Sequence, residues 1–182
     1  MNRSIKFKLK NGKIVTIRRL KATDYDAMML FYERFSKGQG AKWTWMFPGR
    51  YKNRTQESMT KPWTDTNNLY IVAFDGDKIV GTSSAYKVFQ NHPYTGRVAT
   101  TGTTILEEYT SNGLETKFEQ LLEKWALENN VHKFHTEVRQ KNIRSLNNLL
   151  KNGYEIVGLL HDTAFIDGEW HHEYFLEKIL EK

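Results

Sequence analysis

The chain of 182 residues contains no cysteine. This absence excludes disulfide bonds, thiolate metal ligands and a cysteine nucleophile, and it is typical of a reducing compartment, so we expect a cytoplasmic protein. Proline is also scarce, and no linker rich in proline or serine divides the chain. The sequence therefore predicts a single domain over residues 1–182.

Long apolar runs are missing as well. The longest, "AMMLFY", is far too short to cross a bilayer. The first residues, "MNRSIKFKLKNGK", carry positive charge but no apolar run behind it, which is unlike a secretion signal. We therefore expect no membrane partner.

Several familiar enzyme motifs are absent from the sequence. We find no G-x-S-x-G elbow, no Walker loop, no dinucleotide fingerprint and no H-E-x-x-H helix. Six histidines are present, and the densest groups are "HKFH" and His171-His172. On a strand, His132 and His135 point to opposite faces, as do His171 and His172, so the sequence predicts no metal site.

Basic residues outnumber acidic ones. The net charge is +6 and the pI is near 9.4, which favours an anionic partner such as nucleic acid, a phosphorylated cofactor or an acidic surface. The lysines are spread along the chain, and the densest run, "KFKLKNGK", alternates with apolar residues in a hairpin pattern. This spread argues against nucleic-acid binding, because net charge is the one observation in favour of that hypothesis.

The pattern of strands is read from alternation and turns. Three pairs of strands flank Asn11-Gly12, Asp75-Gly76 and Asp167-Gly168, and each of these dipeptides is a strong hairpin signal. The segment "GRVATTGTTILEE" is rich in β-branched residues, and "HKFHTEV" is a shorter candidate strand. We expect eight strands in total.

Four segments have helical patterns. In "TDYDAMMLFYERFSKG", Thr23 and Asp26 predict a capping box and Gly38 an end. A short helix is expected in "NRTQESMTKPW", and another in "NIRSLNNLLKNG", which Gly153 ends. The strongest pattern lies in "EEYTSNGLETKFEQLLEKWA", whose apolar face is formed by Leu114, Phe118, Leu121, Leu122 and Trp125. The element order predicts an α/β domain with a mixed, twisted sheet and helices on both faces.

This order resembles the GCN5-related N-acetyltransferase superfamily from about Ile14 to the end, residues 14–182. "TIRRLKATDYDAM" is similar to the family's first strand and helix, and "LYIVAFDGDKIVG" to its central hairpin. "VRQKNIRSLNNLLKNGYEIVG" resembles its late signature, with Asn142, Gly153 and Tyr154 at the matching positions, and "IDGEWHHEYFLEKIL" its closing hairpin. The resemblance implies the acyl-CoA N-acyltransferase fold and acetyl-CoA as co-substrate. It also implies a small-molecule or peptide amine as acceptor and, by family habit, a homodimer.

The family's pyrophosphate-binding turn, Arg/Gln-x-x-Gly-x-Gly/Ala, falls on "TSNGLE", where only Gly113 matches. Thr110 replaces the basic or amide residue, and Glu115 replaces the small residue and adds a negative charge. The backbone amides that the resemblance assigns to phosphate are those of Ser111, Asn112, Gly113, Leu114 and Thr116. The alternative is that Asn112 and Glu115 form a capping box, so that the helix satisfies its own N–H groups. Both interpretations stay open at this point.

Other family contacts are carried over in the same way. The resemblance implies that backbone groups of Ile105 and Leu106 pair with the pantetheine arm, and that Asn142 supports cofactor binding. Asn142 is equally suited to cap the following helix. The position of the family's tyrosine acid holds Leu149.

A general base is needed to take a proton from the acceptor ammonium. The strand "RVATTGTTIL" carries no acidic residue. His135 and Glu137, on one side of the strand "HKFHTEV", are the nearest catalytic candidates by sequence position. Their alternative interpretation is a packing pair without chemistry.

An aromatic segment follows the first helix. Trp43, Trp45 and Phe47 fall where family members shape the acceptor pocket, and clustered aromatic rings can face a cation or a flat ligand. They can equally fill the core beneath a long loop.

Two functions are consistent with these observations. One is an acetyl-CoA-dependent N-acetyltransferase in which a primary amine attacks the bound thioester directly. The other is a non-catalytic acetyltransferase-like domain that binds a protein, peptide or small ligand in the former cleft.

Overall fold

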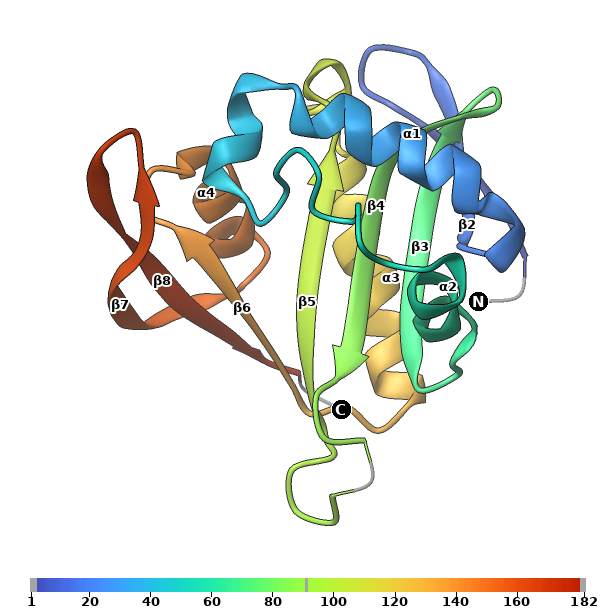
Figure 1. Cartoon of the computed structure of the whole chain (residues 1–182). Coiled ribbons are helices and arrows are strands. Elements are labelled where there is room, and N and C mark those ends of the chain that lie inside the picture. Colours follow the sequence, from blue (N-terminus) through green and yellow to red (C-terminus); the bar gives the residue numbers. More distant parts are fainter. Residues whose placement is uncertain (1–2, 91, 181–182) are drawn as a thin grey trace.

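The computed structural model describes residues 3–90 and 92–180 and contains one mixed sheet of eight strands, in the order β1-β2-β3-β4-β5-β6-β8-β7 (Figure 1). The strands are β1 (Ile5–Lys8), β2 (Ile14–Arg19), β3 (Asn68–Asp75), β4 (Lys78–Lys87), β5 (Val98–Ile105), β6 (Lys133–Arg139), β7 (Glu155–Ile166) and β8 (Glu169–Ile179). The predicted α/β class and mixed sheet are confirmed.

Helices cover both faces of this sheet, as expected. The α-helices are α1 (Tyr25–Ser36), α2 (Gln56–Thr64), α3 (Leu114–Glu128) and α4 (Ile143–Lys151). Short 3-10 helices span Ala22–Asp24 (η1), Gln39–Trp43 (η2) and Glu107–Tyr109 (η3). Helices α1 and α2 lie in front of the sheet in the view of Figure 1, and α3 and α4 lie behind it.

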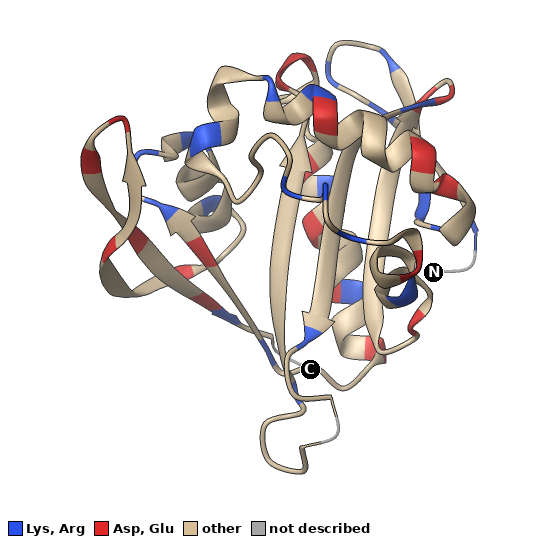
Figure 2. Cartoon of the chain, viewed as in Figure 1, with Lys and Arg blue, Asp and Glu red and all other residues tan. Residues whose placement is uncertain are grey.

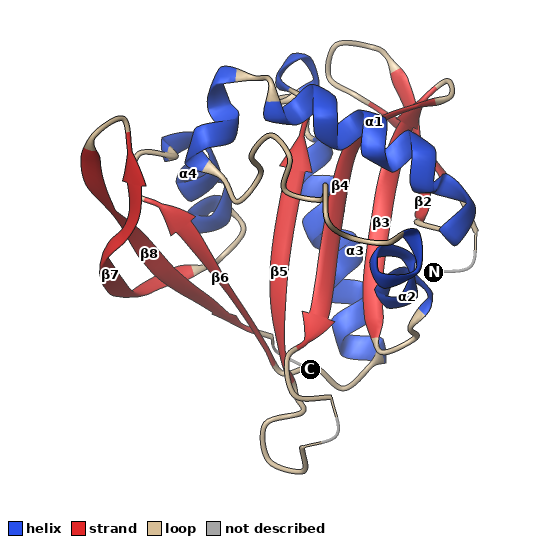
Figure 3. Cartoon of the chain, in the orientation of Figure 1, coloured by secondary structure: helices blue, strands red, loops and turns tan. Residues whose placement is uncertain are grey.

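The relationship that creates the site is the pairing of β5 with β6, the one parallel pair in the described sheet. The two strands pair only over Val98–Lys133, Ala99–Phe134 and Thr100–His135. Beyond these residues they separate, and Figure 3 shows the V-shaped opening between them. The sheet is therefore split toward the carboxyl ends of both strands.

The amphipathic pattern of α3 is borne out by burial. Leu114, Phe118 and Leu122 are completely buried, and Leu121 and Trp125 are nearly so. A Cβ placed on Gly81 of β4 would lie 3.1 Å from Ile105 and 3.3 Å from Phe118, so this glycine lets the helix approach the sheet closely. This packing fixes the position of the helix N-terminus beside the end of β5.

The predicted turns are confirmed in detail. Gly12, Gly76 and Gly168 all have positive φ at the tips of their hairpins, and Gly153 has a φ of 84° just after α4. The predicted capping box of Thr23 and Asp26 is wrong. The carboxylate of Asp24 instead accepts the Lys21 N–H at 2.8 Å and pairs with Arg18 at 2.7 Å, because a 3-10 turn precedes α1.

Charged residues of both signs are scattered over most of the ribbon, although β1 and β2 carry only basic ones (Figure 2). Over the described ranges, the chain has no helix long and apolar enough to cross a membrane.

Candidate functional site

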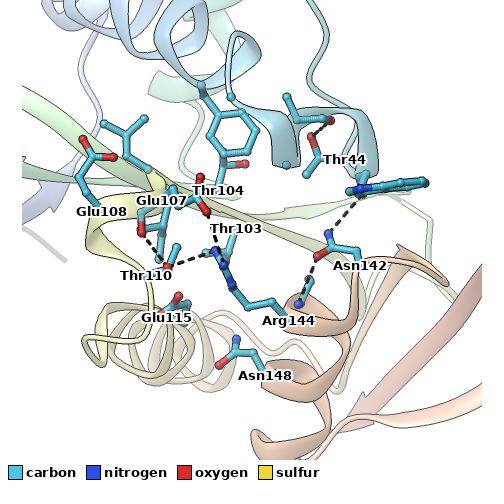
Figure 4. Close-up of a pocket in the computed structure, with 18 of the residues that line it drawn as sticks. Thr44, Thr103, Thr104, Glu107, Glu108, Thr110, Glu115, Asn142, Arg144 and Asn148 are labelled. Carbon is cyan, nitrogen blue, oxygen red and sulfur yellow. Dashed lines mark hydrogen bonds and ion pairs between the residues drawn. The ribbon is translucent and has the colours of Figure 1, made fainter. Parts of the chain in front are cut away.

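A cleft of about 490 Å³ opens where β5 and β6 separate. One wall is formed by the end of β5, η3 and the start of α3, from Thr103 to Glu115. The second wall is the start of α4, from Lys141 to Asn148, and the third is the end of α1 with the loop after it, from Arg34 to Thr44. Figure 4 shows the first two walls facing each other across the opening.

The turn at residues 110–115 lies at the edge of this cleft, which its Thr110 and Glu115 line. Ser111 and Gly113 have positive φ values of 60° and 87°, and Gly113 is the N-terminal cap of α3. Within the described residues, the N–H groups of residues 111–116 have no hydrogen-bond acceptor. Unpaired amides at the N-terminus of a 15-residue helix attract anions, because they add to the positive end of the helix dipole.

The alternative interpretation of the turn, a capping box between Asn112 and Glu115, is wrong. The Asn112 side chain donates to the Thr110 carbonyl at 2.9 Å and accepts the Asn11 N–H at 3.2 Å. The cap position belongs to Gly113, which has no side chain to accept a bond. The side chain of Asn112 therefore links the turn to the hairpin formed by β1 and β2.

Glu115 lines the cleft, and Figure 4 shows it beside Thr110. Its carboxylate has no ion-pair or hydrogen-bond partner in the part of the chain that the structure describes. A carboxylate in the first turn stabilises the helix dipole, but it also opposes a bound anion. The side chain is thus in the position where it would repel phosphate.

Arg144 brings positive charge to the same place. Its guanidinium donates to the Thr110 hydroxyl at 3.2 Å and lies 3.8 Å from the Glu107 carboxylate. Thr110 is the position at which the family's basic or amide residue was expected. Arg144 was not predicted from the sequence, where its one signal is its place two residues after Asn142.

The short helix η3 is fixed by a polar cluster on its far side. The Tyr109 hydroxyl donates to the Asp75 carboxylate at 2.6 Å, and the Lys13 ammonium lies 3.5 Å from both groups. The hydrogen bond from Tyr109 holds the pKa of Asp75 below its ordinary value. This cluster anchors the wall that carries Glu107 and Glu108.

Ile105 and Leu106, which the resemblance assigns to the pantetheine arm, both line the cleft. The Leu106 backbone is already used within the protein, since its N–H donates to the Val80 carbonyl and its carbonyl accepts the Tyr109 N–H, both at 2.9 Å. A backbone contact from this strand to a ligand therefore has to come from residues before Leu106.

Asn142 caps the N-terminus of α4, which is one of the two roles that the sequence left open. Its side-chain oxygen accepts the Ser145 N–H at 3.3 Å, which makes it the N-terminal cap of α4. Its amide nitrogen donates to the Trp43 carbonyl at 3.2 Å. Asn142 lines the cleft, while both ends of its amide are engaged with protein groups.

The three aromatic candidates are separated by the structure. Trp43 lines the cleft, and its ring meets the His171 ring edge-on at 5.2 Å. Trp45 and Phe47 lie outside the residues that line it, and both are more than half exposed. Phe47 borders a second, smaller hollow on the outer side of the same loop.

His135 and Glu137 lie on β6 beside the opening but are not among the residues that line the cleft. The His135 Nε2 is 2.5 Å from the Thr100 hydroxyl, and burial, aided by the nearby Lys133 charge, lowers the pKa of His135. Strand alternation puts both residues on the same face as Arg139, which contacts the aromatic loop. They therefore lie on the side of the sheet that this loop covers.

No group of three or more histidine, aspartate or glutamate side chains in the described ranges is arranged to hold a metal ion.

Comparison with known proteins identifies the class. The sequence matches the model of the acetyltransferase (GNAT) family over residues 27–154, which is most of the chain. The protein belongs to this family. A comparison with curated proteins finds no match.

Solved structures agree with this assignment at the level of the fold. An acetyltransferase of the GNAT family from Streptococcus pneumoniae superposes with a TM-score of 0.81 and 20% identity, covering 92% of this chain and 99% of that one. The ribosomal-protein-S5-alanine acetyltransferase of Vibrio fischeri has a TM-score of 0.76 and 18% identity, covering 99% and 98%. A phosphinothricin acetyltransferase from Sinorhizobium meliloti, solved in complex with acetyl-CoA, has a TM-score of 0.74 and 18% identity, covering 91% and 88%.

Proposed function

We propose that the protein is an acetyl-CoA-dependent N-acetyltransferase that transfers an acetyl group to a primary amine. Family membership supports the reaction class, and the complex of the Sinorhizobium meliloti relative supports acetyl-CoA as the co-substrate. The observation that carries the proposal is the set of unpaired amides at residues 111–116, in a turn whose Thr110 and Glu115 line a cleft between two separating parallel strands. This combination suits a phosphorylated molecule with a long, thin arm.

In this proposal the pyrophosphate lies on the amides of Ser111, Asn112, Gly113, Leu114 and Thr116. Arg144 supplies the positive charge that Thr110 lacks, because its guanidinium already reaches the Thr110 hydroxyl. The arm would run along the β5 edge that β6 leaves unpaired, past Ile105 and over the side chain of Leu106. Asn142 would contribute mainly by shaping the wall, since both ends of its amide are engaged.

The chemistry requires the acceptor amine to be neutral. Its lone pair attacks the thioester carbonyl, the carbon–sulfur bond breaks, and the CoA thiolate leaves and takes up a proton. The proton released by the amine passes to a base, and we assign this role to His135 or Glu137, reached through water. The lowered pKa of His135 keeps the imidazole neutral at pH 7, which is the form that accepts a proton.

The acceptor would enter along the wall formed by the aromatic loop. Trp43 borders the cleft and offers a flat apolar surface to a small-molecule or peptide amine. Trp45 and Phe47, which are exposed on the outer side, would contact only an acceptor that extends beyond the cleft.

A second function is favoured by one observation. Glu115 carries an unpaired negative charge at the phosphate turn, which weakens binding of acetyl-CoA. If this repulsion dominates, the protein is a non-catalytic acetyltransferase-like domain that binds a protein, peptide or small ligand in the same cleft.

Calorimetric titration distinguishes the two functions. Acetyl-CoA and desulfo-CoA are titrated into the protein and into Glu115→Gly. Micromolar binding by the unmodified protein, with release of CoA thiol when amines are added, supports the enzyme. Millimolar or absent binding that glycine restores would reject the enzyme in favour of the binding domain.

Two expectations from the sequence stay predictions. A homodimer is favoured by edge strand β7, where Ile156, Val157, Leu159 and Leu160 are each more than a third exposed. Light scattering on the purified protein would determine its mass.

A cytoplasmic location, favoured by the lack of cysteine, is tested by fractionation of the cells that produce it.

A further inference from the structure

The loop that forms the third wall of the cleft is held by an unusual set of contacts. Three consecutive backbone carbonyls, those of Lys42, Trp43 and Thr44, each accept a hydrogen bond from the end of β6 or the residue that caps α4. Arg139 donates to the first and third, at 2.6 Å for Lys42, and Asn142 donates to the second at 3.2 Å. The two donors come from residues almost 100 positions further along the chain.

Arg139 is itself rigidly placed. Its side chain is only 13% exposed, and its guanidinium lies 3.3 Å from the carboxylate of Glu173, which is buried in β8. The ring of Trp45 packs 5.4 Å from the guanidinium carbon. Both carbonyls accept from one guanidinium nitrogen, Nη1, while Nε lies beside Glu173, so the guanidinium reaches both sets of partners through separate nitrogens, which the single nitrogen of a lysine cannot do as well.

Other contacts hold parts of the same loop. Gln39–Trp43 forms a short 3-10 turn, and the Thr44 hydroxyl donates back to the Ala41 carbonyl at 2.7 Å. Other anchors are an exposed ion pair between Lys42 and Asp167 at 2.6 Å, the edge-on contact of Trp43 with His171, and a hydrogen bond from Arg50 to the Trp45 carbonyl. Exposed ion pairs contribute little. Arg139 and Asn142 are the residues whose side chains hold the three consecutive carbonyls.

We propose that Arg139 and Asn142 form a clasp that holds the loop Gly38–Phe47 as a fixed wall of the cleft, and that this clasp selects the amines that the protein accepts. The inference rests on the proposed acetyltransferase function. Ala41, Trp43 and Thr44, which lie within or next to the clasped segment, all border the cleft, so the clasp sets its width on the acceptor side. Arg139 and Asn142 are positioning residues, because they act on the acceptor through the loop.

Fixing a wall before the substrate arrives has a known physical effect. A loop that is already in its binding conformation loses less conformational freedom when the ligand enters, so the ligand binds more tightly. It also rejects molecules that need a wider opening. A released loop should therefore bind the preferred amine more weakly and distinguish poorly between small and large amines.

Two substitutions remove the clasp while keeping the other roles of its members. Arg139→Lys keeps a positive charge beside buried Glu173, but its single nitrogen cannot reach Glu173 and the two carbonyls together. Asn142→Ser keeps a side chain able to cap α4 but is too short to reach Trp43. Arg97→Lys is the matched control, because Arg97 binds Asn130 near the start of β5, away from the cleft.

The first readout is limited trypsin digestion after Lys42, which needs no knowledge of the acceptor. The scissile carbonyl is the one that Arg139 holds, so cleavage requires the clasp to open. Loss of a hydrogen bond from a charged donor should raise the cleavage rate by about tenfold or more in Arg139→Lys. Asn142→Ser should raise it less, and Arg97→Lys should leave it unchanged.

The second readout is the KM for methylamine, lysine, spermidine and a lysine-containing peptide, measured beside the calorimetric Kd for acetyl-CoA. We expect the KM of the preferred amine to rise by about tenfold in Arg139→Lys, with less distinction between amines and little change in the acetyl-CoA Kd. Faster cleavage with unchanged amine preference would overturn the selection role, and unchanged cleavage in both variants would overturn the clasp itself. If no amine is acetylated at all, the proposed function fails, and the clasp is judged on the cleavage rates alone.

Discussion

The guanidinium of Arg144 lies 3.2 Å from the hydroxyl oxygen of Thr110, across the mouth of the cleft. These two residues belong to different walls, 34 positions apart in the sequence. A basic side chain thus reaches the turn in space although the turn's own sequence lacks one. The positive charge that is missing at Thr110 comes from Arg144 of α4.

Replacing Arg144 should weaken acetyl-CoA binding. Removing one charge-assisted contact to phosphate in Arg144→Ala is expected to raise the calorimetric Kd by about tenfold, with a weaker dependence on salt. Lys151→Ala removes the same charge from the other end of α4 and serves as the control. Equal affinities in both variants would mean that Arg144 pairs only with Glu107.

Neutralising Glu115 should have the opposite effect. A carboxylate about 4 Å from a phosphate opposes binding by on the order of 4 kcal/mol at an effective dielectric near 20, and exposure to water reduces this value. We expect Glu115→Gln to lower the Kd for acetyl-CoA by at least about tenfold. Glu128→Gln removes the same charge from the far end of α3. An unchanged or higher Kd in Glu115→Gln would show that the carboxylate turns away from the bound phosphate.

The base assigned to His135 predicts a characteristic pH profile. Because burial lowers its pKa, the rate should rise with pH through an inflection below the ordinary value of 6.5 and then level off. His135→Gln should remove this inflection and lower the rate by about 10²-fold or more. His132→Gln, at an exposed position, is the control. Glu137→Gln tests the other candidate for the base. A profile that is identical in His135→Gln would assign the base to another group.

A buried carboxylate outside the cleft predicts how stability changes with pH. Glu119 on α3 is 7% exposed, with the Lys178 ammonium 3.8 Å from its carboxylate, and burial raises its pKa to about 7. Because this value lies above the ordinary 4.5, the folded state holds the proton more tightly than the unfolded state. The stability that this proton contributes is fully present below pH 4.5 and is lost as the pH rises to about 7.

Glu119→Gln removes this dependence, because an amide cannot ionise. Relative to the unmodified protein, the variant should gain on the order of 3 kcal/mol in free energy of unfolding between pH 4 and pH 8. Denaturant unfolding at several pH values measures the gain. The control Glu128→Gln, at an exposed position, should show the same change of unfolding free energy with pH as the unmodified protein. If Glu119→Gln also shows that same change, the carboxylate of Glu119 ionises freely in the folded protein.

Much of the fold could be predicted because the signals are local. Asn11-Gly12, Asp75-Gly76 and Asp167-Gly168 specify their turns by backbone preference alone. The apolar face of α3 follows from helical periodicity, and the position of the turn before it follows from a single glycine between a strand and that helix.

The parts of the site that could not be predicted depend on distant residues. Asn112 does not cap α3, because the backbone of the first hairpin uses its side-chain oxygen. Arg144 and Arg139 act on Thr110 and on the aromatic loop, and no periodicity links residues so far apart. The capping box at Thr23 failed for a related reason, since Arg18 draws Asp24 into a tertiary ion pair.

The gap between β5 and β6 also affects the stability of the fold. Past Thr100, the edge of β5 that faces β6 lacks its neighbouring strand, and the Thr136 hydroxyl satisfies one of its carbonyls, that of Thr101, at 3.0 Å. The rest of that edge depends on water or a bound molecule for its hydrogen bonds. A continuous sheet would be more stable but would leave no room for a ligand. The protein therefore forgoes stability at its centre, and a molecule that fills the gap should raise its melting temperature.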